Sequence, residues 1–152
     1  MPVSEHDAKI IAGLQPEFGV AVYAWLNDCM AEDLPVILSE GLRSFARSDA
    51  LYAQGRTAPG PKVTNAKAGQ SYHGFGLAVD AVFRTPSMQP SWDFDPFSPV
   101  WKRVVKLAKD RGLQWGGDWT KFRDFPHFQP AAVPTLAECR RKWPKGWTPK
   151  KV

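Results

Sequence analysis

SYHGFGLAVD, residues 71–80, is the stretch on which the expected fold depends. It places His73 in a glycine-flanked turn and a carboxylate, Asp80, seven positions later inside an apolar run. Residues 77–83 offer apolar side chains to both faces of a strand, so we expect this strand to be central in a sheet. Burying Asp80 there is costly unless a cation or good hydrogen bonds compensate. The next question is which residues complete a site around this carboxylate.

The composition is that of one domain. With 152 residues the chain can bury a sizeable core without disulfides. We expect Cys29 and Cys139 to be reduced core thiols, with a single disulfide as the alternative. The amino-terminal residues have neither the basic run nor the apolar segment of a secretory signal, and no later stretch reaches transmembrane length. We therefore expect a protein made in the cytoplasm without a signal peptide.

The net charge of +5 favours polyanions such as nucleic acid, anionic lipid or acidic cell-wall polymers, without choosing among them. Part of the excess lies in a basic carboxyl-terminal extension, residues 131–152, which follows an expected core of about residues 7–130. This extension either helps the protein approach an anionic surface or is a solvated tail.

The apolar periodicity alternates between helical and extended segments. Helices are expected over residues 7–14, after Pro16, and over 45–54, 100–112 and 136–143; strands are expected over 36–41, 77–83 and 113–116 and around Phe128. In the helix over 100–112, an apolar stripe of Val100, Val104, Leu107 and Ala108 is expected to face the core. Two long irregular segments, 56–70 and 84–99, are expected at the surface, and loops of this length are often functional.

A second candidate histidine lies in DFPHFQ, residues 124–129. Pro126 stiffens the approach to His127, and on an extended segment His127 and Gln129 share one face. Two imidazoles and a carboxylate form a common catalytic zinc set, because three protein ligands leave one tetrahedral position for water. Asp124, three residues before His127, is the natural candidate for the base that hydrolysis also needs. The alternative is that His73, Asp80 and His127 are unrelated polar groups, each satisfied locally.

Three separated motifs carry a family resemblance. They are Ser-x-His-x-x-Gly-x-Ala-x-Asp at 71–80, Trp-Gly-Gly-Asp-Trp at 115–119 and Asp-x-Pro-His-Phe at 124–128. In this order they resemble the zinc peptidases that include D-alanyl-D-alanine carboxypeptidases and phage L-alanyl-D-glutamate endopeptidases. Residues 43–45, 51–57 and 63–66 look like the endolysin branch of that family, so the resemblance covers roughly residues 36–130.

The resemblance implies a role for several residues. His73, Asp80 and His127 match the ligands of one zinc ion, and Asp124 matches the general base and acid. Arg43 matches an arginine that contacts the substrate carbonyl and can stabilise the oxyanion, although a surface salt bridge is an alternative.

Four further residues are candidates for substrate binding. Ser71 matches a serine that lines the substrate site, but a turn-forming serine is an alternative. Trp115 and Trp119 either wall the cleft or pack the Gly-Gly turn between them. Ser48 stands where relatives commonly have a glutamine, which puts that substrate contact in doubt, and Gly74 replaces a common asparagine.

The expected protein is a small single α+β domain, with helices packed on a central, mainly antiparallel sheet and zinc in a cleft. The resemblance implies a monomeric endolysin that hydrolyses the L-alanyl-D-glutamate bond of peptidoglycan, stored in the host cytoplasm and acting on the wall after release. Its expected partner is then bacterial peptidoglycan, with weak association of the basic tail with the wall or outer membrane, and no specific nucleic acid. The alternatives are a D-alanyl-D-alanine carboxypeptidase on the same fold and a non-catalytic wall-binding module.

Overall fold

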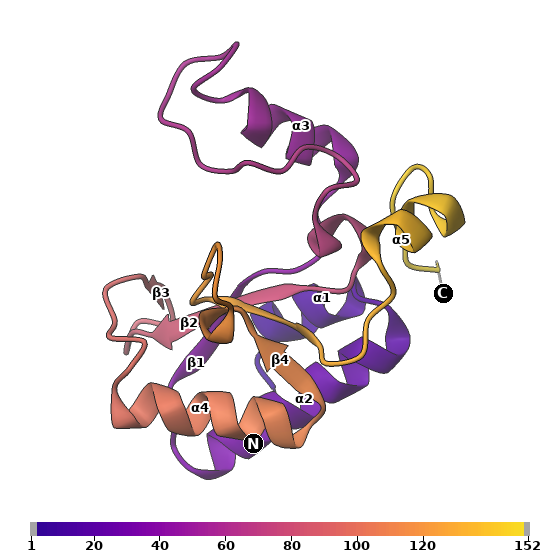
Figure 1. Ribbon diagram of the computed structural model, residues 1–152. Helices are drawn as coiled ribbons and strands as arrows, with labels where there is room; N and C mark the ends of the chain where they lie inside the picture. The colour runs from indigo at the N-terminus through magenta and orange to yellow at the C-terminus, as the bar shows by residue number, and fades with distance from the viewer. Residues whose placement is uncertain (1–2, 151–152) are drawn as a thin grey trace.

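The computed structural model describes residues 3–150 and shows five α-helices around a five-stranded sheet (Figure 1). The helices are α1 (Glu5–Ala12), α2 (Pro16–Ala31), α3 (Phe45–Ala53), α4 (Pro99–Asp110) and α5 (Leu136–Lys142). The strands are β1 (Val36–Glu40), β2 (Val79–Arg84), β3 (Pro90–Ser91), β4 (Leu113–Trp115) and β5 (His127–Pro130), and two short 3₁₀ turns are η1 (Tyr72–Phe75) and η2 (Gly116–Asp118). The small α+β domain expected from the sequence is confirmed.

The sheet is antiparallel throughout, in the order β1-β2-β5-β4, with β3 added to β2. β2 lies in the interior of the sheet, as its apolar residues on both faces predicted. Its Asp80 is the direct partner of His127 on β5, and Glu40 at the end of β1 lies opposite Asp80 beyond a register irregularity. Three polar side chains from three neighbouring strands therefore reach the same end of the sheet.

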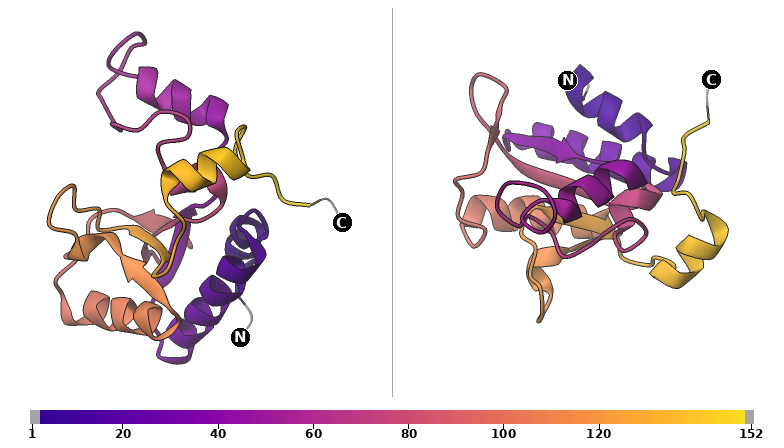
Figure 2. Two further views of the ribbon diagram at one scale, coloured as in Figure 1. Left: turned by 45° about the vertical axis from the view of Figure 1, so that its right-hand side comes forward. Right: turned by 90° about the horizontal axis from the view of Figure 1, so that it is seen from above.

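The core lies between the sheet and the two helices α2 and α4, which contact each other. Trp25 of α2 packs against Phe128 of β5 in a tilted arrangement, with ring centroids 4.5 Å apart. Its buried indole N–H donates to the Val104 carbonyl of α4 at 3.0 Å, which satisfies the polar end of the ring. α3 stands away from α2 and α4, and the loop of residues 56–70 extends from it (Figures 1 and 2).

Side-chain caps fix where four of the helices begin. Ser4, Ser44, Ser98 and Thr135 each accept a hydrogen bond from a backbone N–H in the first turn of the helix that follows. These N–H groups have no partner within the helix, so each cap stabilises its helix start by about 1 kcal/mol.

The expected apolar stripe of α4 is partly wrong. Val100 is 46% exposed, whereas Trp101 beside it is fully buried. The buried face is centred on Trp101, Val104, Val105 and Ala108, which share helical spacing, with Leu107 at its edge. Val100 therefore lies just outside this face, because the large Trp101 ring fixes the rotation of the helix by packing against Phe128 and Phe83.

The chain after β5 folds back onto the turn that carries His73. The Tyr72 hydroxyl donates to the Pro134 carbonyl at 2.7 Å, and the backbone N–H of Trp147 donates to the Gly74 carbonyl at 3.0 Å. The Trp143 ring packs against Phe75 with centroids 6.4 Å apart. In Figure 2, α5 lies beside the base of α3. Residues 134–147 thus hold η1 in place from outside.

Two remaining expectations concern the thiols and the membrane. Cys29 and Cys139 are both buried free thiols. Within residues 3–150 no helix combines the length and apolar character needed to cross a bilayer.

Candidate active site

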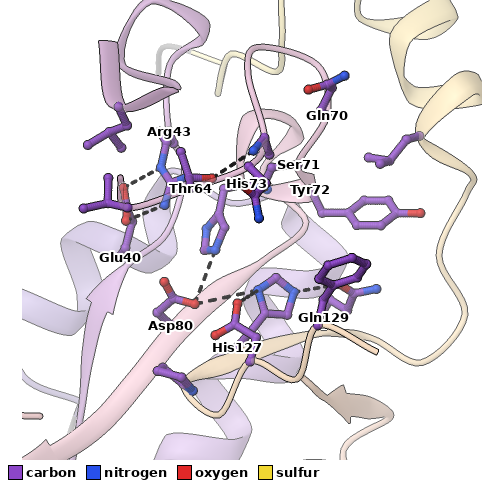
Figure 3. Close-up of a pocket in the computed structure, with 18 of the residues that line it drawn as sticks. Glu40, Arg43, Thr64, Gln70, Ser71, Tyr72, His73, Asp80, His127 and Gln129 are labelled. Carbon is purple, nitrogen blue, oxygen red and sulfur yellow. Dashed lines mark hydrogen bonds and ion pairs between the residues drawn. The ribbon is translucent and has the colours of Figure 1, made fainter. Parts of the chain in front are cut away.

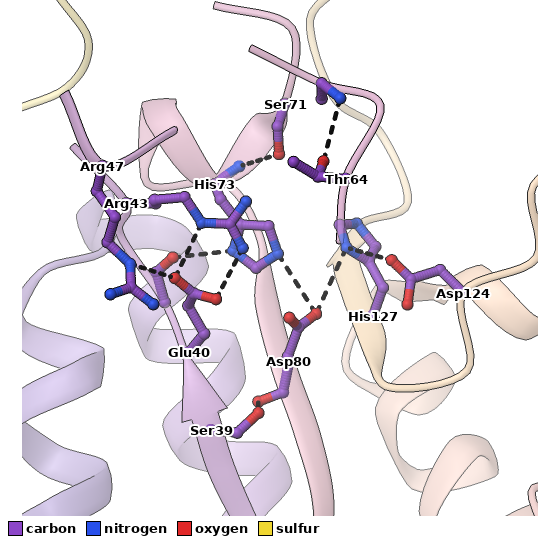
Figure 4. A network of polar contacts seen from close by, with 12 residues as sticks. Ser39, Glu40, Arg43, Arg47, Thr64, Ser71, His73, Asp80, Asp124 and His127 are labelled. Carbon is purple, nitrogen blue, oxygen red and sulfur yellow. Dashed lines mark hydrogen bonds and ion pairs between the residues drawn. The ribbon is translucent and has the colours of Figure 1, made fainter. Parts of the chain in front are cut away.

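His73, Asp80 and His127 converge at the end of the sheet, as Figures 3 and 4 show. One potential ligand atom from each residue lies within 4.8 Å of the others. His73 Nε2 is 3.3 Å from Asp80 Oδ1, and His127 Nδ1 is 3.7 Å from the same oxygen. The structure therefore brings together the three residues that the motifs single out, and this group could hold a metal ion.

The outer nitrogen of each imidazole is held by a neighbouring oxygen. His73 Nδ1 lies 2.9 Å from the Gly41 carbonyl, which can only accept, so this nitrogen donates and Nε2 faces Asp80. His127 Nε2 lies 2.7 Å from Gln129 Oε1, which leaves Nδ1 facing Asp80. Such outer contacts fix the orientation and tautomer of metal-binding imidazoles. Both rings thus direct their inner nitrogens at one carboxylate.

Asp80 itself indicates a cation. Its Oδ1 is buried and has no hydrogen-bond partner among residues 3–150. Although burial favours the neutral acid, the pKa of Asp80 lies below its usual value, because His73 and His127 stabilise the carboxylate. A buried carboxylate whose oxygen has no hydrogen-bond donor is costly unless a positive charge compensates it. Two imidazoles and a carboxylate are also a donor set that Zn²⁺ accepts, so the residues fit the metal.

Asp124 lies at the edge of this group, with its Oδ2 3.7 Å from His127 Nδ1. Burial, followed by the negative charge of Asp80, raises the pKa of Asp124 to about 6. Burial, followed by the charge of His73, lowers the pKa of His127 to about 4. The two neighbours are thus set apart chemically: Asp124 is suited to carry a proton and His127 to remain a neutral donor.

Arg43 enters the cleft from the segment that follows β1. Its Nε and Nη2 donate to the two carboxylate oxygens of Glu40 at 2.9 Å and 2.7 Å, and both side chains are largely buried. Arg47 approaches the same carboxylate at 3.3 Å (Figure 4). The salt bridge considered as the alternative for Arg43 is therefore present, but it lies in the cleft and leaves Nη1 without a hydrogen bond among the described residues.

The cleft around these residues has a volume of about 990 Å³. One wall is the loop after α3, with Thr64 and Asn65, and another is α5, with Leu136 and Arg140. Arg56 fixes the loop by donating to the Thr64 carbonyl at 3.1 Å while its guanidinium stacks on Tyr52, 3.9 Å from the ring centroid. The surface is thus built from segments far apart in the sequence.

The predicted substrate-binding residues divide into two groups. Ser71 and Trp119 line the cleft, and Trp119 packs against His127 with ring centroids 5.1 Å apart. Ser71 also forms the turn, because its hydroxyl accepts from the His73 N–H at 3.3 Å.

Trp115 and Ser48 do not line the cleft. Trp115 is 6% exposed and donates to the Phe125 carbonyl at 2.7 Å. A side chain at Gly117 would collide with the Trp115 ring, so Trp115 packs the Gly-Gly turn from beneath. Ser48 is 3% exposed inside α3.

Some cleft residues were not predicted from the sequence. They include Glu40, Gln129, Arg140 and two exposed aromatic side chains, Trp92 and Phe122. Phe122 is 85% exposed with φ of 55°, an unusual backbone conformation for a bulky residue. The only sequence signal for Gln129 was its two-residue spacing from His127 on an extended segment.

Comparisons with known proteins confirm the resemblance carried by the motifs. Residues 64–130 match a family model described as D-alanyl-D-alanine carboxypeptidase. The chain is 42% identical over 101 residues to the peptidoglycan L-alanyl-D-glutamate endopeptidase CwlK of Bacillus subtilis, covering 63% of this chain and 60% of CwlK. It is 39% identical over 61 residues to the L-alanyl-D-glutamate peptidase of Listeria phage A118, covering 40% of this chain and 21% of that protein. The chain thus spans less than two thirds of either relative.

Among solved structures, the fold is similar to the L-Ala D-Glu endopeptidase ChiX of Serratia marcescens. The TM-score is 0.62 at 27% sequence identity, with 95% of this chain and 94% of ChiX covered. Unlike the sequence matches, this structural match includes nearly the whole of both chains.

Proposed function

We propose that this chain, whose sequence and fold are similar to those of peptidoglycan peptidases, is a zinc-dependent endopeptidase that hydrolyses the L-alanyl-D-glutamate bond of peptidoglycan stem peptides. The observation that carries the proposal is the convergence of His73 and His127 on one buried carboxylate oxygen of Asp80, with Asp124 3.7 Å from His127. The relatives named above are L-alanyl-D-glutamate peptidases, which supports this bond over others.

One Zn²⁺ held by His73, Asp80 and His127 would supply an activated water and polarise the scissile carbonyl. Asp124 takes a proton from the attacking water and returns it to the leaving amine nitrogen as the C–N bond breaks. Its raised pKa of about 6 suits both steps, because the carboxyl must accept and release a proton near neutral pH. Arg43 Nη1, which has no hydrogen bond within residues 3–150, is available to the carbonyl oxygen, where negative charge develops, and the guanidinium does not change protonation state.

The alternative function is that of a D-alanyl-D-alanine carboxypeptidase, the activity named in the description of the matching family model. The metal site does not separate the two reactions, since both need the same ligands and base. Purified peptidoglycan is digested with the wild type and with Asp124→Ala, and the fragments are identified by mass spectrometry. New amino-terminal D-glutamate supports the endopeptidase, whereas free D-alanine supports the carboxypeptidase. If neither the wild type nor Asp124→Ala released any fragments, both peptidase activities would be excluded, and a non-catalytic wall-binding module would remain.

Further parts of the proposal concern assembly and surroundings. We propose that the enzyme acts as a monomer on the wall after release from the host cytoplasm. The exposed basic side chains of the carboxyl-terminal segment, including Lys142, Lys145 and Lys150, would favour anionic wall polymers. Binding of the Asp124→Ala protein to purified walls, followed across a salt series, tests this last point, since a charge contribution weakens as salt rises.

A further inference from the structure

Three arginines line the cleft, and their charges are not balanced in the same way. Arg43 and Arg47 both pair with the carboxylate of Glu40. Arg140, on α5, donates from Nη1 to a neutral group, the Gly69 carbonyl, at 2.8 Å. Among the ion pairs of residues 3–150, none involves Arg140. Its positive charge is therefore available to a ligand in the cleft.

The position of Arg140 is fixed by its neighbours. Cys139, directly before it, is fully buried, and Thr135 caps the start of α5. The Arg140 stem packs against Gly69, where an added Cβ would lie 3.2 Å from Cδ and 3.4 Å from Cγ. Gly69 has φ of 79°, which a residue with a side chain rarely adopts. The guanidinium is thus carried on a packed helix and stem, so little side-chain freedom is lost when a ligand binds.

The proposed substrate carries a matching charge beside the scissile bond. When glutamate is acylated at its amine by alanine, one of its two carboxyl groups continues the peptide and the other stays free. A free carboxylate thus enters the cleft on the leaving-group side of the reaction. A guanidinium is the side chain best suited to hold a carboxylate.

We propose that Arg140 binds the free carboxylate of the glutamate residue and so determines specificity at the position after the scissile bond. This inference rests on the proposed function and adds a substrate contact from α5, which lies outside the residues matched by the family model. It also makes residues 131–147 part of the peptidase domain.

The test uses two stem peptides that differ only in whether the free carboxyl of the glutamate is ionisable or amidated. Wild type should cleave the free acid with a kcat/KM about tenfold or more above that for the amide, the size expected for one charged hydrogen-bonded contact. Arg140→Gln should bring this ratio close to one, mainly by loss on the acid. Arg140→Lys keeps the positive charge without the two parallel N–H donors of a guanidinium, and it should retain a reduced preference for the free acid.

Arg141→Gln is the matched control, because it removes the same charge from the next position of α5, which does not line the cleft. It should keep the wild-type ratio. Thermal melting and zinc content of each variant exclude a general loss of structure. If Arg140→Gln keeps the preference for the free acid, the inference is overturned while the proposed function stands. The same holds if the preference is lost in Arg47→Gln and kept in Arg140→Gln, because Arg47 would then bind the carboxylate. A wild type that cleaves neither peptide overturns the proposed function and, with it, this inference.

Discussion

Glu40 holds the guanidinium of Arg43 through both of its carboxylate oxygens, at 2.9 Å from Nε and 2.7 Å from Nη2. The same short segment also positions His73. The Gly41 carbonyl contacts the His73 Nδ1, and the backbone N–H of Arg43 donates to the His73 carbonyl. Residues 40–43 therefore connect the proposed oxyanion contact to one of the proposed metal ligands. We therefore infer that Glu40 is a positioning residue that acts through Arg43.

Replacing Glu40 by Gln should lower kcat about 10- to 100-fold with a smaller change in KM, because a small displacement of Arg43 is felt mainly in the transition state. Zinc content should stay at the wild-type level. Combining it with Arg43→Ala should add little to the Arg43→Ala effect, since the two residues act as one unit.

The control for this prediction is Glu32→Gln, which breaks a similar two-point pair with Arg103, at 2.7 Å and 2.8 Å, on the exposed surface. Its kcat should be unchanged. Additive losses in the Glu40 and Arg43 double variant would show that Glu40 does not work through Arg43.

Asp124→Ala should reduce kcat about 10²- to 10⁴-fold, the usual contribution of a positioned general base. The metal content should remain, because the three proposed ligands do not include Asp124. Cleavage of a defined stem peptide and metal analysis of the same sample measure both effects. Loss of zinc together with activity would instead make Asp124 a fourth ligand.

Chelation should abolish cleavage, and added zinc should restore it. The far-ultraviolet circular dichroism should hardly change, because Asp80 and His127 lie on strands paired by backbone hydrogen bonds and packed on the core. The melting temperature should fall, since a ligand that binds only the folded state stabilises it. Asp80→Asn should show little zinc-dependent rise in melting temperature; a full rise in that variant would contradict the assignment of Asp80 as a ligand.

The two thiols should be unreactive in the native protein. Burial, followed by the charges of Asp28 and Glu32, raises the pKa of Cys29 to about 12, and burial also raises the pKa of Cys139. Thiolate is the reactive form, so at pH 8 a disulfide reagent should modify neither residue until denaturant is added, and then both. Fast modification of the folded enzyme would show that one of them is accessible.

Removing residues 140–152 should destabilise the protein and abolish the proposed activity, because Trp143 and Trp147 hold the turn that carries His73. Trp143→Ala alone should cost about 2 kcal/mol, which lowers the melting temperature by roughly 4–8 °C. Removal of residues 149–152 is the control, since the contacts described above end at Trp147. An active, equally stable protein after the longer deletion would show that the segment does not support the site.

The sequence indicated the part of the site that is encoded locally. His73 and Asp80 lie on one turn and the strand after it, and Asp124 and His127 share another short segment. Spacing brought each pair into view, and the family resemblance implied their roles. Antiparallel pairing then places Asp80 opposite His127. Central placement of β2 followed from its apolar residues on both faces.

Other features depend on contacts between distant segments, which spacing does not reveal. Arg140 reaches the cleft only because the chain after β5 folds back onto the His73 turn, where the Arg140 stem packs on Gly69. Glu40 is recognisable only once Arg43 is seen to pair with it. Val100 was misplaced because the packing of Trp101, and not the count of apolar positions, sets the rotation of α4. Trp115 and Trp119 could not be told apart until the Gly-Gly turn between them was seen.

The return of the chain to the His73 turn has a consequence for biosynthesis. The contacts that hold this turn, from Pro134 to Trp147, belong to residues that a ribosome makes after every proposed ligand and the proposed base. During translation the sheet can assemble first, since domains fold progressively as the chain emerges. The cleft, however, gains its last wall and the outer support of His73 only after Trp147 has left the ribosome. The nascent chain should therefore have no peptidase activity until Trp147 has emerged.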